Sequence, residues 1–64
     1  MLYSLVIAAG FFMVTAPEHL SQESCHDLAI SLMRPGETAI QLKNGELVII
    51  GKDSMVICMR EEND

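Results

Sequence analysis

Residues 38–50 read TAIQLKNGELVII, and this stretch decides the fold because it holds the clearest structural pattern in the chain. Apolar, strand-forming runs flank Asn44-Gly45, a dipeptide that accepts positive φ at both positions and favours a two-residue type I′ hairpin turn. Such a turn sets the cross-strand pairs, which are Lys43 with Glu46, Leu42 with Leu47 and Ile40 with Ile49. The stretch therefore predicts a β-hairpin with an apolar face built from the last two pairs.

A third strand is expected after the hairpin. Residues 51–54, Gly-Lys-Asp-Ser, predict a second turn, and residues 55–59, Met-Val-Ile-Cys-Met, are apolar at every position. We therefore expect residues 37–59 to form a three-stranded antiparallel meander. Residues 60–64 are mostly charged and mainly acidic, and we expect them to be a frayed tail.

Upstream of the meander, the sequence predicts a helix over residues 17–34. Thr15-Ala16-Pro17-Glu18 matches a capping box, and Ser21 offers a second possible start at Gln22. Pro35-Gly36 ends the segment. Apolar residues that repeat at helical spacing form one stripe that can lie on a sheet: Cys25, Leu28, Ala29, Leu32 and Met33.

Residues 1–16 carry no charge, and 13 of these 16 residues are apolar. The segment could be a signal peptide, but no basic residue precedes the apolar run and Pro17 follows the apparent cleavage site. It could be a membrane span, but residues 2–16 as a helix would cover only about 22 Å of a 30 Å hydrocarbon core. A run rich in β-branched and aromatic residues around Gly10 favours one bulged strand or two strands. We expect this segment to lie beside the last strand.

The apolar content is high for so short a chain. Half of the 64 residues are apolar, yet a chain of this length is one domain with a marginal core. The expected fold is α+β, a β-α-β-β-β domain in which one helix packs on an antiparallel meander sheet. One helix covers one sheet face, so we expect a homodimer to cover the other. The residues expected at that interface are Val48, Ile50, Val56 and Cys58.

The two cysteines do not form a recognisable motif. Cys25 and Cys58 could form the one possible disulfide, but both stand among apolar neighbours and small disulfide-rich domains usually carry more cysteines. We therefore expect two small buried side chains rather than a bridge. No Cys-x-x-Cys pair is present, so no zinc site, metal or other cofactor is predicted.

The expected helix has one polar face that contains a single apolar residue. Helical spacing places two histidines and two acidic residues on this face, and an isoleucine falls among them. An apolar residue flanked by charges can anchor a protein contact, so this face is the candidate partner-binding site. Its residues are His19, Glu23, His26, Asp27 and Ile30. The same set also resembles an ordinary solvated helix face.

The pattern of functional residues excludes more than it identifies. No nucleophile dyad or glycine-rich phosphate loop is visible, and 4 basic residues against 9 acidic ones argue against a nucleic-acid groove. We expect a non-enzymatic, acidic, protein-binding regulator or inhibitor that acts as a homo-oligomer in the cytoplasm. One alternative is a membrane-associated or secreted protein anchored by residues 2–16. Another is a small-ligand sponge with pockets at the oligomer interface.

Overall fold

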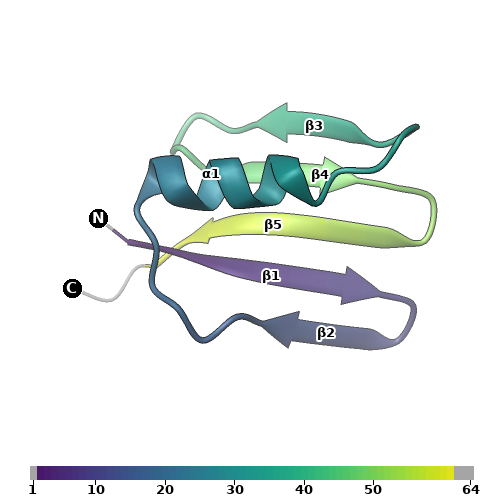
Figure 1. The fold of residues 1–64 in the computed structure, drawn as a ribbon, viewed down its shortest axis with the longest axis horizontal. Coiled ribbons are helices and arrows are strands. Elements are labelled where there is room, and N and C mark those ends of the chain that lie inside the picture. The colour runs from purple at the N-terminus through teal and green to yellow at the C-terminus, as the bar shows by residue number, and fades with distance from the viewer. Residues whose placement is uncertain (1, 62–64) are drawn as a thin grey trace.

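The computed structural model describes residues 2–61, which form one helix and five strands. The elements are β1 Tyr3–Ala9, β2 Phe12–Thr15, α1 Gln22–Ser31, β3 Thr38–Gln41, β4 Leu47–Ile50 and β5 Ser54–Arg60. The strands make a single antiparallel sheet in the order β2-β1-β5-β4-β3, and α1 lies across one face of it (Figure 1). The expected α+β domain, one helix on an antiparallel meander sheet, is confirmed.

The apolar N-terminal segment forms two strands, β1 and β2, joined by a tight turn. Gly10 has φ +60°, and Ala9 pairs with Phe12 across a two-residue loop. Glycine with positive φ at the first loop position is the signature of a type II′ hairpin turn. β1 also pairs with β5 along its whole length, which confirms that the N-terminal segment lies beside the last strand. Within residues 2–61, no helix has the length and apolar content needed to cross a membrane.

The helix starts at Gln22, so the prediction of a start at Pro17 is wrong and the alternative start is confirmed. Ser21 is the N-cap, and its hydroxyl accepts a hydrogen bond from the Ser24 backbone N–H at 3.2 Å. The capping box fails because Thr15 belongs to β2.

Backbone pairing also keeps the segment before α1 extended. Leu20 exchanges two backbone hydrogen bonds with Tyr3, at 2.7 and 2.9 Å, so it continues along the edge of β1 that β2 occupies. At the other end, α1 stops at Ser31, and Met33 and Arg34 lie beyond the helix predicted to contain them. The helix starts later than predicted because pairing with β1 holds its N-terminal flank in an extended conformation.

The hairpin forms where predicted, but its register is shifted by one residue. Ile40 pairs with Val48 rather than with Ile49, and the loop closes through a 2.8 Å bond from the Leu42 N–H to the Glu46 carbonyl. The predicted pairs of Lys43 with Glu46 and of Leu42 with Leu47 are therefore also wrong.

The cause of the shift lies in the loop itself. Asn44 keeps a negative φ, and its side-chain oxygen accepts a 3.1 Å bond from the Glu46 N–H. Only Gly45, with φ +91°, takes the left-handed conformation, as in three-residue hairpin loops. Since strand side chains alternate between faces, the one-residue shift moves every β3 side chain to the opposite face from that predicted.

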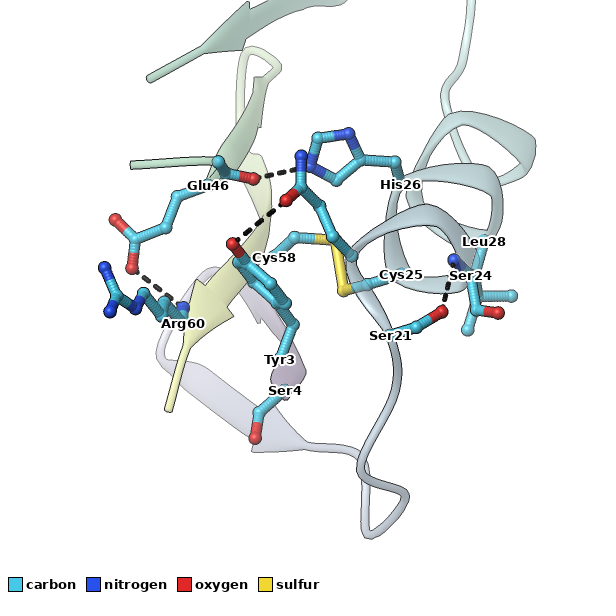
Figure 2. Close-up of a disulfide and its surroundings, with 12 residues drawn as sticks. Tyr3, Ser4, Ser21, Ser24, Cys25, His26, Leu28, Glu46, Cys58 and Arg60 are labelled. Atoms are coloured by element: carbon cyan, nitrogen blue, oxygen red, sulfur yellow. Dashed lines mark hydrogen bonds between the residues drawn. A yellow bond between two sulfur atoms is a disulfide. The ribbon is translucent and has the colours of Figure 1, made fainter. Parts of the chain in front are cut away.

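A disulfide joins the helix to the sheet. Cys25 of α1 and Cys58 of β5 are bridged, with Cα atoms 6.0 Å apart and a sequence separation of 33 (Figure 2). The expectation of two unbridged cysteines is therefore wrong. Both side chains are fully buried in the core, which contains no charged residue among those described. The core cluster consists of Tyr3, Leu5, Cys25, Ala29, Leu47, Ile49, Val56 and Cys58.

The start of the predicted frayed tail is ordered. Arg60 is the last residue of β5, and its backbone N–H donates to the Glu46 carboxylate at 2.9 Å. The Glu61 N–H donates to the Leu2 carbonyl at 2.9 Å. Residues 62–64 of that tail, like Met1, lie outside the described residues.

Candidate functional site

The two faces of the sheet differ in what covers them. The covered face lies under α1 and holds the core, whereas no helix of the described residues lies over the other face, which we call the open face (Figure 1). Strand register places twelve residues on it: Ser4, Val6, Ala8, Met13, Thr15, Thr38, Ile40, Val48, Ile50, Met55, Ile57 and Met59. Nine of the twelve are apolar and none is charged. Such a surface is unusual on a monomer.

The four residues predicted for the oligomer interface lie on two different faces of the sheet. Val48 and Ile50 lie on the open face. Val56 and Cys58 do not, because they pair with the core residues Ile49 and Leu47 on the covered face. Both are buried, and Cys58 is in the disulfide.

Apart from Val48, the residues at the centre of the open face were not predicted from the sequence. Val6, Ile57, Val48 and Ile40 form one continuous row across four strands. Ile40 joins this row only because of the three-residue hairpin loop. The signal that could have placed it is the Asn44 side chain, which can hold a neighbouring backbone N–H and so favours a turn without positive φ.

The open face combines rigid and adaptable side chains. Three methionines lie on it, Met13, Met55 and Met59, and a flexible thioether can fit a surface of irregular shape. Ile40, Ile50 and Met59 remain more than 40% exposed. Val6 is buried although no helix covers it, because its neighbours on the same face surround it. The open face is therefore an apolar surface in which some side chains are buried by their neighbours and others are exposed to solvent.

β2 is an exposed edge of the sheet. All four of its residues are exposed, including Phe12 at 77%, Met13 at 74% and Val14 at 61%, and Phe11 in the adjoining turn is fully exposed. Edge strands are usually protected by charges, prolines or bulges. Residues 11–16 contain no charge and no proline. This edge is therefore a second candidate interaction surface.

The structure divides the predicted partner-binding residues of the helix face. Glu23, Asp27 and Ile30 are exposed on α1. His19 precedes the helix, so the prediction of a five-residue face is wrong. His26 is partly buried and bonds to the hairpin loop. Among the described residues, no three histidine, cysteine or acidic side chains come together as a metal site.

His26 and Tyr3 hold the β3–β4 loop against the helix. The His26 Nε2–H donates to the Gly45 carbonyl at 2.6 Å, and the Tyr3 and His26 rings meet edge to face with centroids 6.5 Å apart (Figure 2). The Tyr3 hydroxyl lies 3.1 Å from the Asn44 carbonyl oxygen and 3.3 Å from Oε1 of Gln22. These contacts join the first strand, the helix and the β3–β4 loop into one structural junction.

His19 binds the carboxylate of Glu61. The distance from His19 Nδ1 to Glu61 Oε2 is 2.6 Å, and the Ser4 hydroxyl donates to the same oxygen at 2.8 Å. The hydrogen bond from His19, then that from Ser4, lowers the pKa of Glu61 from its ordinary value of 4.5. The contact ties the segment before α1 to the end of β5.

We expect the substitution His19→Ala to raise the pKa of Glu61 toward its ordinary value, measured by carbon-13 NMR titration of the side-chain carboxyl. Because the folded pKa of Glu61 is lowered, these contacts stabilise the fold above the unfolded pKa near 4.5. That stabilisation is lost as the pH falls through the folded pKa. Glu18→Gln, next to His19, is the control and leaves the Glu61 pKa unchanged. A Glu61 pKa that does not move in His19→Ala contradicts the assignment.

A shallow cleft of about 530 Å³ lies at the end of the sheet where the β1–β2 and β4–β5 turns meet the segment after α1. Its charged residues balance, with Arg34 and Lys52 opposite in sign to Glu37 and Asp53. The Glu37 carboxylate accepts hydrogen bonds from the Arg34 N–H at 2.7 Å and from the Ser54 hydroxyl at 3.4 Å. The two basic and two acidic side chains that line the cleft therefore leave it without excess charge.

Comparison with known proteins adds no relative: no protein-family model, curated protein or solved structure matches the chain.

Proposed function

We propose that this protein is a non-enzymatic, protein-binding module that works as a homodimer, with the open faces of two copies packed together. The observation that carries the proposal is the open face itself, with nine apolar and no charged side chains among its twelve. Covering it removes apolar surface from water, which is the main driving force of association. A second copy fits because an uncharged surface meets no repulsion from its own image.

The size of the open face supports this occupant. The Cα atoms extend 33 × 22 Å in the plane of Figure 1. Accessible surface exceeds a flat outline of these dimensions, because side chains corrugate the face and extend past the backbone. A standard protein–protein interface buries about 800 Å² on each partner. The open face is therefore comparable in size with the surface that a stable dimer buries.

Partners other than a second copy would meet the outside of the dimer. Face-to-face packing leaves α1 on each outer surface, with Glu23, Asp27 and Ile30 exposed. The net charge of −5 disfavours nucleic acid and anionic lipid as partners. We therefore keep the role of a regulator or inhibitor that occupies another protein's surface.

The disulfide changes the compartment that we propose. Protein disulfides persist in oxidising environments and are rare in the reducing cytosol. The bridge between Cys25 and Cys58 is fully buried and joins two core elements, as a structural disulfide does. We therefore propose that this protein functions in an oxidising compartment rather than in the cytoplasm expected from the sequence.

We expect Ile50→Lys to weaken self-association roughly a hundredfold, measured by sedimentation equilibrium. In a symmetric dimer the variant places two ammonium groups in an apolar interface, and partial escape of the long side chains to water limits the cost to about 3 kcal/mol. Ile30→Lys is the matched control, since Ile30 on α1 is 49% exposed and Ile50 is 43% exposed. Equal association of the two variants, or a wild-type chain that stays monomeric, overturns the proposal.

A further inference from the structure

Within residues 2–61 no strand pairs with the outer edge of β2, which carries a set of backbone hydrogen-bonding groups. The Ala16 N–H donates to the Leu5 carbonyl at 2.8 Å, which places Ala16 and, by alternation, Val14 and Phe12 at the hydrogen-bonded positions facing β1. The N–H and C=O groups of Met13 and Thr15 then point away from β1. An exposed edge of this kind is a template for another strand.

We propose that β2 pairs antiparallel with β2 of a second copy, so that two five-stranded sheets become one continuous sheet. One register uses both outward residues of each strand: Met13 opposite Thr15 of the other copy. This register makes four backbone hydrogen bonds, and it places Val14 next to the twofold axis. Centring the pair on Met13 instead would leave Thr15 facing the turn residue Phe11.

The side chains of the edge suit this self-pairing. In the same register Phe12, 77% exposed, lies opposite Ala16 of the other copy, and a small residue leaves room for the ring. The strand carries no charge that would meet a like charge in its own image. The second copy is therefore favoured over a charged peptide as the strand that completes this edge.

The β2 edge contact can coexist with the proposed face-to-face dimer. The size of the complete assembly therefore rests on that proposed function. Antiparallel edge pairing within one sheet has its twofold axis perpendicular to the sheet, and face-to-face packing has its axis parallel to the sheet. When the axis of the face-to-face dimer runs across the strands it meets the edge axis, and two perpendicular twofold axes that intersect generate a closed tetramer with D2 symmetry. The expected assembly is therefore four copies of the 7.1 kDa chain, arranged as two ten-stranded sheets packed through their open faces.

The test compares Met13→Pro with Met13→Ala by sedimentation equilibrium, which counts the chains in each assembly. Both variants lose the Met13 side chain, but only proline removes the outward N–H, and an outward edge position tolerates proline. We expect wild type and Met13→Ala to be tetramers, and Met13→Pro and Ile50→Lys each to be dimers. The double variant Met13→Pro/Ile50→Lys lacks both contacts and is expected to be a monomer.

Amide hydrogen exchange gives a second readout at single residues. We expect the N–H groups of Met13 and Thr15 to exchange slowly in wild type, and the Thr15 N–H to exchange at the rate of an exposed amide in Met13→Pro. Fast exchange in wild type, or equal masses of Met13→Pro and Met13→Ala, overturns the edge pairing. A wild-type dimer that becomes a monomer in Met13→Pro but not in Ile50→Lys supports the edge pairing and overturns the face-to-face dimer.

Discussion

The double variant Cys25→Ala/Cys58→Ala is expected to lose about 4 kcal/mol of unfolding free energy. The bridge closes a loop across 33 residues of sequence, and the restriction of the unfolded chain by a loop of that size amounts to about 4 kcal/mol. A domain of this length commonly has total stability of the same order as this loss. We therefore expect the reduced or bridgeless chain to be partly unfolded at 25 °C.

The contacts of α1 explain why the chain depends on this bridge. Only Cys25 and Ala29 of α1 are buried. The side chains of Leu28 and Ile30 in α1, and of Leu32 just after it, are each more than 40% exposed. Most helical stability in proteins comes from packing of an apolar face, and α1 packs little of one. The disulfide therefore holds α1 on the sheet, a role that a wider apolar face of the helix has in larger domains.

The measurement is urea denaturation followed by circular dichroism at one fixed chain concentration, because association also changes apparent stability. The control is reductant, which destabilises the wild-type chain and leaves the double variant unchanged. Ser24→Ala, next to Cys25 on the exposed side of α1, is the matched control for alanine substitution in the helix. A loss below about 1 kcal/mol in the double variant contradicts this account of how α1 is held.

Gly45→Ala is expected to lose about 3 kcal/mol of unfolding free energy. Gly45 has φ +91°, and a residue with a Cβ atom in the left-handed region costs about 1–2 kcal/mol. A Cβ atom at this position would also collide with the Tyr3 hydroxyl and would lie 2.9 Å from Oε1 of Gln22. Moving the Tyr3 ring breaks its hydrogen bond to the Asn44 carbonyl, a further loss of about 1 kcal/mol.

Gly36→Ala separates the two parts of this cost. Gly36 has φ +89°, nearly the same as Gly45, but an added Cβ atom there meets nothing within 4 Å. We expect this control to lose only the conformational part, about 1–2 kcal/mol. Thermal and urea unfolding of the two variants at equal chain concentration measure the difference. Equal losses for Gly45→Ala and Gly36→Ala would show that the Tyr3 junction does not constrain the loop.

The disulfide and the open face both involve strands β1 and β5. These two strands are largely apolar, and they pair over seven positions at the centre of the sheet. One face of this pair is covered by α1 and the disulfide, and the other is covered by nothing in the described residues of a single copy. The disulfide stabilises one face of these two strands, and the proposed self-association would cover the opposite face.

Local sequence determined the kinds of elements but not all of their boundaries. The hairpin around Gly45, the apolar last strand and a helix ending before Pro35 were all predictable, because each has a strong local pattern. The start of α1 was not, since Thr15 is an equally good capping residue and strand residue. Only the pairing of β2 with β1 decided between these two roles.

The candidate interaction surfaces were also determined partly by the sequence and partly by the tertiary structure. That this chain has more apolar side chains than one helix on one sheet can cover follows from its length and composition alone. Which residues form the exposed surface was decided by tertiary structure, because strand alternation makes the assignment depend on the parity of one loop. The loop at Asn44 has three residues rather than two, so Ile40 lies on the open face. Likewise, the register of β4 with β5 places Cys58 on the face that α1 covers, where it bonds to Cys25. The two cysteines are 33 positions apart, and no local sequence pattern specifies this contact.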